Sequence, residues 1–273
     1  GAALDDMAVY QRESKSKYAD YNRRLFFGLM PLSYAVDLSA PLEILQKFAT
    51  PQQINGQNPR GGTALQEAIR LNNPEMVKFL LLHKADISSE PKIFLQSVKE
   101  NVAPEILEEL LKAGADVNAA DEDGGNAAVW AVKHNDLRLL NLLQKYHADF
   151  QTLLPDGKNL LFYAINLHCG ELVINMLIAT GLDINQPDKN GNFLLLNALK
   201  SKDYELTEKL LKLKADVNMT DSSNESAVSF VLENSVPPKI FKKIMAKKVD
   251  TSRLFGKQHK PLWRLAAEAE QYE

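Results

Sequence analysis

The sequence predicts an all-α solenoid of about seven and a half repeats, each a pair of short helices joined to the next by a hairpin-like turn. A short phrase recurs along the 273 residues, as AGADVN, HKADIS, TGLDIN and LKADVN. A small, apolar helical segment opens every 30 to 34 residues, and a leucine-rich helical pattern follows it. Helix pairs this short bury their apolar faces only by stacking on neighbouring pairs, so we expect the repeats to share one continuous core.

The first helix of each repeat opens at positions spaced by 33, 30, 33, 33, 34, 33 and 34 residues. These positions are Met30, Thr63, Ile93, Asn126, Asn159, Phe193, Ser226 and Lys260. In the fourth repeat the pattern predicts helices over 126–134 and 136–146, with Asp136 as the N-cap of the second. Leu137, Leu140 and Leu143 form the predicted apolar stripe, with Leu139 and Leu142 beside it.

The recurring phrase marks the end of each second helix and the turn into the next repeat. Gly114 and Gly181 suit a left-handed position after the helix. Other side chains occupy the same position elsewhere, and there we expect weaker or differently shaped turns: Lys84, His147, Lys214 and Lys248. We expect the asparagine that ends the phrase, at Asn118, Asn185 and Asn218, to bond the hairpin backbone.

The loops between repeats carry a tight-turn pattern, D-x-x-G, at 121–124 and 188–191, with variants at 155–157 and 221–224. We call each of these turns a finger. The third repeat is three residues short and has Pro91 where glycine is expected. We therefore expect its finger to be missing or collapsed.

A period of about 33 residues, with TALQEA at 63–68, NAAVWA at 126–131 and NLLFYA at 159–164, resembles the T-P-L-H-x-A motif of the ankyrin repeat family. The resemblance covers roughly residues 25–268 and implies a protein-binding solenoid with fingers and first helices on an inner, concave face. We expect an ankyrin-like repeat domain over 25–273 that ends in a capping half-repeat. Residues 1–24 are expected to be an N-terminal helical segment or a linker.

Charge and composition bound the class of function. A net charge of −3 predicts no general attraction to nucleic acids or acidic membranes. The single cysteine, Cys169, excludes an internal disulfide and fits a reducing compartment. No apolar run reaches the roughly 18 residues of a membrane span, and the N-terminus lacks the apolar core of a secretion signal. We expect an intracellular monomer, cytoplasmic or nuclear, or inside a host cell if a bacterium secretes it.

The residues predict no catalytic, metal or cofactor site. His168 and Cys169 are neighbours in sequence and fall in the loop between two helices, so they do not face each other. The five histidines are scattered, whereas a zinc site needs three or four clustered ligands. The phosphate-binding, dinucleotide-binding and metalloprotease motifs are absent from the sequence. We expect no catalysis and no small-molecule substrate.

The resemblance implies that the variable residue of the T-P-L-H-x-A motif faces the binding groove. That residue gives a ladder: Tyr34, Glu67, Ser97, Trp130, Tyr163, Asn197, Phe230 and Arg264. Trp130 and Tyr163 fall in neighbouring repeats and are residue types that often anchor interfaces. The expected partner is another protein or a peptide, of basic character because it faces acidic fingers. The predicted contact residues are Tyr34, Arg70, Glu122, Asp123, Trp130, Lys133, His134, Asp156, Lys158, Tyr163, Asn166 and Asn197. The alternative is that the aromatic side chains only pack on their neighbours along the groove.

The C-terminal repeat is strongly basic. Nine lysines and arginines between residues 239 and 264, opposed only by Asp250, give a local charge of +8 and leave −11 (−3 minus 8) for the rest of the chain. Such polarity would attract an acidic partner, nucleic acid or a lipid headgroup. The alternative is the solvated face of a terminal helix, with Lys242, Lys243, Lys247 and Lys248 outside and Ile240, Phe241, Ile244 and Met245 inside.

Two functions from different classes remain open. In the first, the chain is a non-catalytic module that binds a protein through its groove. In the second, it is the substrate-targeting or regulatory arm of a larger multidomain enzyme, such as a bacterial effector that acts in a host cell. The partner is not encoded in any motif of the sequence.

Overall fold

The computed structural model describes residues 32–37, 41–58, 61–252, 254–255, 260–261, 263–265 and 267. It divides into two compact units. Unit 1 comprises residues 1–121 and 142–147, and unit 2 comprises residues 122–141 and 148–273. The expected N-terminal segment, 1–24, lies outside the described residues, and the expected cap at the C-terminus is described only in part.

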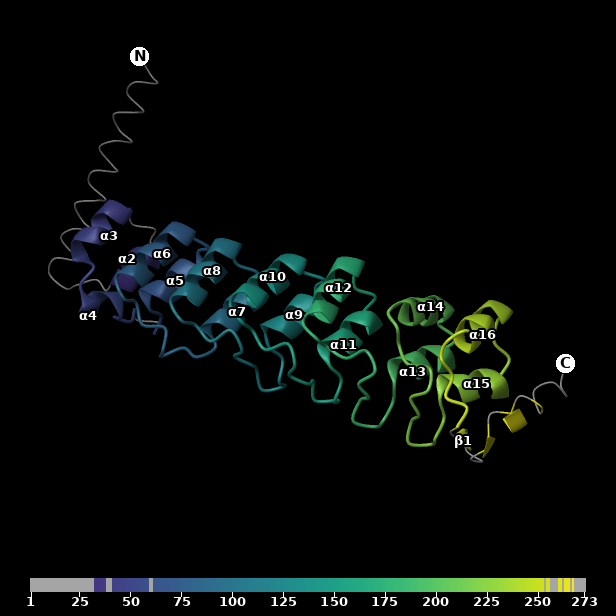
Figure 1. The fold of residues 1–273 in the computed structure, drawn as a ribbon. Coiled ribbons are helices and arrows are strands. Elements are labelled where there is room, and N and C mark those ends of the chain that lie inside the picture. Colours follow the sequence, from purple (N-terminus) through teal and green to yellow (C-terminus); the bar gives the residue numbers. More distant parts are fainter. Residues whose placement is uncertain are drawn as a thin grey trace, which may run out of the picture. The chain divides into compact units, whose positions relative to one another are not determined.

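Pairs of short helices follow one another along the described chain (Figure 1). The first helices of the pairs are α2 (Leu32–Asp37), α5 (Ala64–Arg70), α7 (Ile93–Lys99), α9 (Ala127–Lys133), α11 (Leu160–Asn166), α13 (Leu194–Lys200) and α15 (Ala227–Glu233). The second helices are α3 (Leu42–Phe48), α6 (Pro74–Leu82), α8 (Pro104–Lys112), α10 (Leu137–Lys145), α12 (Glu171–Ala179), α14 (Tyr204–Lys212) and α16 (Pro238–Met245). This arrangement confirms the predicted all-α repeat fold.

Two elements depart from the predicted pattern. A single helical turn, α4 (Pro51–Ile54), follows α3 and has no counterpart in the later repeats that are described. Two short strands, β1 (Leu254–Phe255) and β2 (Lys260–Pro261), pair antiparallel where we expected the last repeat to open. None of the described helices has the length and apolar character needed to cross a membrane.

Helices α5, α9, α11 and α15 begin where a side chain caps the backbone. Asn126 Oδ1 accepts a hydrogen bond from the backbone N–H of Val129 at 3.0 Å, and Asn159 Oδ1 accepts one from Phe162 at 2.7 Å. Thr63 and Ser226 cap α5 and α15 in the same way. In these repeats the first position of the motif is therefore an N-cap, which satisfies one of the backbone donors left open at a helix start. At α7 and α13 the first position supplies no such cap, since Ile93 is the first residue of α7 and Phe193 makes no cap hydrogen bond.

The second helices bury leucine side chains in the core of the repeats. Leu139, Leu140 and Leu143 are at most 7% exposed, whereas Leu137 and Leu142 are only half-buried. The buried stripe therefore consists of Leu139, Leu140 and Leu143, and it is rotated about the helix axis relative to the predicted stripe, which included Leu137. Asp136 caps α10 as predicted, since its Oδ1 accepts a hydrogen bond from the Leu139 backbone at 3.0 Å.

Asparagine side chains join one repeat to the next within each unit. In unit 2, Asn185 Oδ1 accepts a hydrogen bond from the Asp216 backbone N–H at 2.8 Å, and Asn218 Oδ1 accepts one from Asp250 at 2.8 Å. In unit 1, Asn55 accepts one from Asp86 at 2.8 Å. We expected the phrase-ending asparagines to bond the hairpin backbone. Asn185 and Asn218 do bond turn backbone, and the backbone donor that each satisfies belongs to the following repeat.

The turns after the second helices confirm the left-handed conformation in five repeats. Gly114 and Gly181 have φ of 92° and 85°. Lys84, His147 and Lys214 have φ of 65°, 57° and 65°, and a left-handed residue other than glycine costs about 1–2 kcal/mol. Lys248 does not adopt a positive φ, so the last turn is shaped differently, as we expected for that position.

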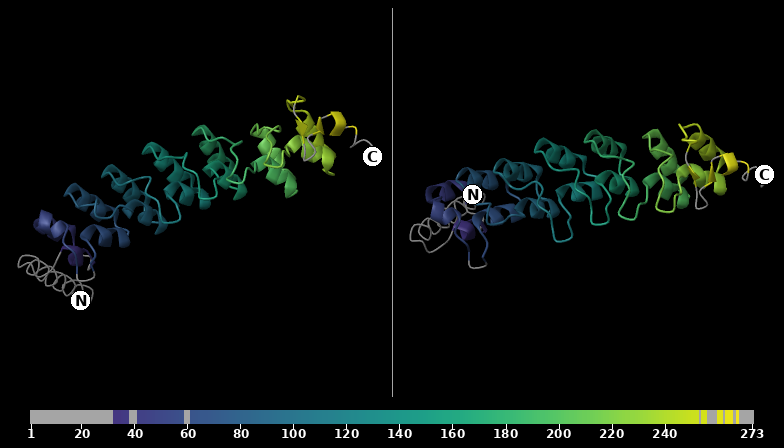
Figure 2. Two further views of the ribbon diagram at one scale, coloured as in Figure 1. Left: turned by 90° about the horizontal axis from the view of Figure 1, so that it is seen from below. Right: turned by 60° about the horizontal axis from the view of Figure 1, so that its bottom comes forward.

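Most repeats in the described chain carry a hydrogen-bonded finger. In the finger before α13, the Asp188 N–H donates to the Asn192 carbonyl at 3.0 Å and Gly191 has φ of 77°. Figure 2 shows the fingers of unit 2 projecting beyond the layer of first helices. In the third repeat a tight turn replaces the finger, with Glu90 N–H donating to the Ile87 carbonyl at 3.2 Å. The expectation of a collapsed third finger is therefore correct.

Candidate functional site

Trp130 lies on α9 and is half-buried. Its ring is stacked on the ring of His134, with 4.3 Å between centroids and a 33° angle between the planes. The ammonium nitrogen of Lys133 lies 5.9 Å from the indole centroid, a weak cation–π geometry. Both neighbours are exposed and belong to the end of the same helix. The indole is therefore held in one orientation by its own helix, with part of its surface open to solvent.

Tyr163 occupies the equivalent position on α11 and is also half-buried. Helices α9 and α11 pack side by side within unit 2 (Figure 1). Asn166 is exposed at the end of α11, and Asn197 is half-buried on α13. We call the part of unit 2 that carries Trp130, Lys133, His134, Tyr163 and Asn166 the aromatic face.

The fingers next to the aromatic face differ in charge. Glu122 and Asp123 are exposed in the turn before α9. In the finger before α11, Lys158 Nζ lies 2.7 Å from Asp156 Oδ2, and this hydrogen bond holds the pKa of Asp156 below its ordinary value. Lys158 Nζ also lies 5.4 Å from the Phe162 ring centroid. The Asp156 carboxylate of the second finger is therefore neutralised within that finger, whereas the Glu122 and Asp123 side chains of the first are exposed.

The predicted ladder is not uniformly open. Glu67 and Ser97, in unit 1, are 8% and 1% exposed. Ser97 Oγ donates to the Ile93 carbonyl of its own helix at 2.8 Å. Arg70 is exposed and directs its Nε to Glu67 at 2.8 Å. Tyr34 belongs to α2, but its side chain lies outside what the structure describes.

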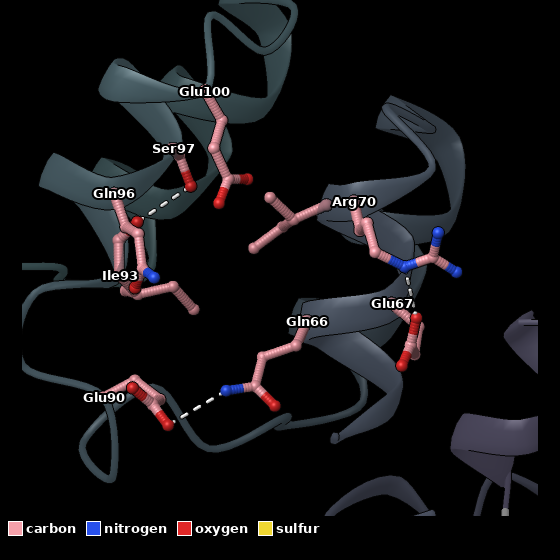
Figure 3. Close-up of a pocket in the computed structure, with 9 residues that line it drawn as sticks. Gln66, Glu67, Arg70, Glu90, Ile93, Gln96, Ser97 and Glu100 are labelled. Atoms are coloured by element: carbon pink, nitrogen blue, oxygen red, sulfur yellow. Dashed lines mark hydrogen bonds and ion pairs between the residues drawn. The ribbon is translucent and has the colours of Figure 1, made fainter. Parts of the chain in front are cut away.

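The sequence did not predict an open pocket of about 220 Å³ between α5 and α7 in unit 1 (Figure 3). Its lining combines Gln66, Glu67, Ile69 and Arg70 from α5 with Glu90, Ile93, Gln96, Ser97 and Glu100 from the third repeat. Two signals were present in the sequence. A small residue, Ser97, stands where the next repeats carry Trp130 and Tyr163, and the third finger is short.

The cysteine and histidine of the α11–α12 loop form no catalytic pair. Cys169 is buried, its Sγ donates to the Val132 carbonyl at 3.2 Å, and burial raises the pKa of the thiol. A protonated, enclosed thiol is not a reactive nucleophile. His168 is exposed on the same loop with φ of 52°. Across the described ranges, no three histidine, cysteine or carboxylate side chains gather in a way that could hold a metal ion.

The basic last repeat is partly neutralised by α14. Lys239 and Lys243 lie 2.8 and 2.6 Å from the two oxygens of Glu208, and these hydrogen bonds lower the Glu208 pKa to about 2. Lys247 Nζ donates to the Leu211 carbonyl at 3.0 Å. Because α16 ends at Met245, Lys247 follows the helix rather than belonging to its solvated face. These pairings favour the explanation that the lysines belong to the packing and the polar surface of the last repeat, over the explanation that they attract an acidic partner.

Family models match most of the repeat region. The model described as "Ankyrin repeats (3 copies)" matches residues 94–188 and 128–221, and the model "Ankyrin repeat" matches residues 60–89. An ankyrin repeat domain from Acinetobacter baumannii AYE superposes with a TM-score of 0.56 at 24% identity, covering 68% of this chain and 98% of that one. This structural similarity supports the fold and no more than the fold.

Among curated relatives, the ankyrin repeat domain-containing protein SAT10 of Stachybotrys chartarum is 26% identical over 197 residues, 71% of this chain and 10% of that protein. The ankyrin repeat and SOCS box protein 6 of Homo sapiens is 34% identical over 122 residues, 41% of this chain and 29% of that protein. The nuclear factor NF-kappa-B p105 subunit of Gallus gallus is 35% identical over 124 residues, 42% and 12% respectively. This chain thus spans 10% to 29% of the length of these relatives. With the repeat period, the helix pairs and the fingers, these matches show that the chain belongs to the ankyrin repeat family.

Proposed function

We propose that this chain binds a partner protein or peptide through the aromatic face of unit 2, with no catalysis of its own. Ankyrin repeats are generally protein–protein interaction modules, which supports the class of function. The observation that carries the location is the pair Trp130 and Tyr163, partly open at equivalent positions of the adjacent helices α9 and α11. Large aromatic side chains supply much of the binding free energy of an interface from a small area.

The side chains around the two rings define the chemistry of the partner. Asn166 and Asn197 offer amide donors and acceptors that suit an extended backbone. Glu122 and Asp123 add exposed carboxylates in the turn before α9. A partner with basic residues opposite these carboxylates gains favourable electrostatics, which act mainly on the association rate and on specificity. The paired Asp156 and Lys158 contribute little charge of their own.

We test the proposal with a peptide selected on the full chain from a random display library and made with a fluorescent label. The double variant Trp130→Ala plus Tyr163→Ala removes both anchors. An alanine substitution at an anchor costs about 2 kcal/mol or more, so the affinity should fall at least about 30-fold. Leu172→Ala, at a 69% exposed apolar residue on α12, is the matched control and should leave the affinity unchanged.

The unfolding midpoint of each variant establishes that the repeats remain folded. An unchanged affinity in a folded double variant would exclude the aromatic face as the binding surface. Peptides that select equally well on the wild-type chain and on the double variant would have the same meaning.

A further inference from the structure

The pocket of unit 1 is enclosed by two first helices and a shortened turn. Its apolar wall comes from Ile69 and Ile93, and its polar wall from glutamine, glutamate and serine side chains of α5, α7 and the turn before α7 (Figure 3). Its volume, about 220 Å³, is below the roughly 300–1,000 Å³ of sites for drug-sized ligands. A space of this size suits a single side chain better than a cofactor.

The pocket exists because two space-filling features are missing from the third repeat. Ser97 is small and turns its hydroxyl to the Ile93 carbonyl, so it leaves open the space that an aromatic residue takes at the same position of α9 and α11. The turn at 87–92 also lacks a projecting finger. The hollow is therefore a consequence of residues that distinguish this repeat from its neighbours.

The charge of the lining is negative. Three carboxylates, Glu67, Glu90 and Glu100, stand against one cation, Arg70. The Arg70 guanidinium turns away from the open space and toward Glu67, with 2.8 Å between Nε and Oε2 (Figure 3). Glu67 Oε1 also accepts a hydrogen bond from Asn58 Nδ2 at 2.9 Å. Glu67 and Arg70 thus satisfy each other, and the remaining charge belongs to the other two carboxylates.

Glu90 and Glu100 keep hydrogen-bonding capacity toward the pocket. Glu90 Oε1 accepts one bond, from Gln66 Nε2 at 2.9 Å, whereas an ionised carboxylate can accept about four. Glu100 directs its carboxyl group toward the open space, and none of the described residues pairs with it (Figure 3). The nearby Lys99 is engaged elsewhere, since its Nζ lies 2.7 Å from Asp121 Oδ2.

We propose that this pocket binds the side chain of an arginine presented by a partner protein. The guanidinium is planar and carries five N–H donors that suit carboxylate acceptors, and its methylene stem suits the apolar surface of Ile69 and Ile93. The Gln96 side chain adds an amide group to the lining, whereas the Gln66 Oε1 is already bonded by the Thr63 backbone N–H at 2.8 Å. The pocket lies in unit 1, so the inference does not depend on the aromatic face of unit 2.

The test uses the full chain with labelled isoleucine methyl groups, because Ile69 and Ile93 line the pocket and report on it by NMR. The probe is the blocked peptide acetyl-Gly-Ser-Arg-Ser-Gly-amide, and its control replaces arginine by citrulline, which has the same shape without the charge. We expect saturable shifts of both methyl signals with a Kd on the order of 1 mM for the arginine peptide, and no saturable shift for the citrulline peptide.

Variants that remove the charge of Glu90 and Glu100 test whether these two carboxylates bind the guanidinium. Glu90→Gln plus Glu100→Gln should weaken binding of the arginine peptide about fivefold to tenfold, because each exposed ion pair contributes up to about 1 kcal/mol. Glu105→Gln, at an exposed glutamate of α8 outside the lining, is the matched control and should not change the Kd.

Three results would overturn the inference. The first is that Ile69 and Ile93 do not respond to the arginine peptide. The second is an equal response to citrulline, and the third is an unchanged Kd in the double variant. None of them bears on Trp130 and Tyr163, so a failure here is distinguishable from a failure of the proposed function.

Discussion

Asn218 offers a direct test of how one repeat supports the next. Its Oδ1 accepts a hydrogen bond from the Asp250 N–H at 2.8 Å, and its Nδ2 donates to the Lys248 carbonyl at 2.9 Å. Both bonds cross from one repeat to the next and lie next to α16. A neutral hydrogen bond contributes about 0.5–1.5 kcal/mol net, so losing two should cost the local structure about 1–3 kcal/mol.

The assay is native-state hydrogen exchange on Asn218→Ala. Backbone amides of α16 should exchange about 5 to 150 times faster, because the free energy of local opening falls by about 1–3 kcal/mol. Amides of α5 to α8 in unit 1 should keep the wild-type rate, since a repeat stack depends on contacts between neighbours. Asn175→Ala, at an exposed position of α12, is the control and should leave the exchange of α16 unchanged.

Two outcomes would refute the reasoning about Asn218. Wild-type exchange of α16 in the variant would show that the two bonds do not hold the last repeat. Equally faster exchange in both units would show that the chain opens as one cooperative body rather than repeat by repeat.

The remaining predictions concern charge, packing and the thiol. Glu208→Gln should lower the urea midpoint at pH 7. The pKa of Glu208 is about 2 in the folded chain and about 4.5 in the unfolded chain, so the difference in midpoint between wild type and variant should shrink as the pH falls below about 4.5. A difference that stays constant with pH would contradict this. Leu110→Ala, at a fully buried residue of α8, should destabilise by about 2–5 kcal/mol in urea unfolding, whereas Leu82→Ala, at a 72% exposed residue, should change little. Cys169 should react with iodoacetamide only in denaturant, because burial encloses the thiol and raises its pKa; fast labelling of the folded chain would contradict this.

The helix pairs were predictable because their signals are local. In the fourth repeat, helices expected over 126–134 and 136–146 occur as Ala127–Lys133 and Leu137–Lys145. The side chain of Asp136 caps α10 from within the same turn, so nearby sequence suffices to find it. Gly114 and Gly181 adopt the left-handed turn predicted for them, whereas Lys214, where we expected a weaker or differently shaped turn, adopts the same conformation.

The candidate site was less predictable because exposure depends on residues that are distant in sequence. Glu67 occupies a ladder position, yet Asn58 from the preceding finger bonds its carboxylate and the residue is buried. Asp156 and Lys158 were both predicted as contact residues, but they pair with each other across a separation of two residues within one turn, and this leaves their charges neutralised. The small size of Ser97 alone does not determine whether a cavity remains beside it. That depends on whether side chains from neighbouring elements fill the space.

A hydrogen-exchange footprint of the library-selected peptide bound to the full chain tests directly whether the aromatic face is the binding surface. We expect slower exchange in the turn at 121–125 and in the first helices α9 and α11, with no change in the second helix α12 of the same unit. Protection centred on α12 and α14, with α9 and α11 unaffected, would contradict it.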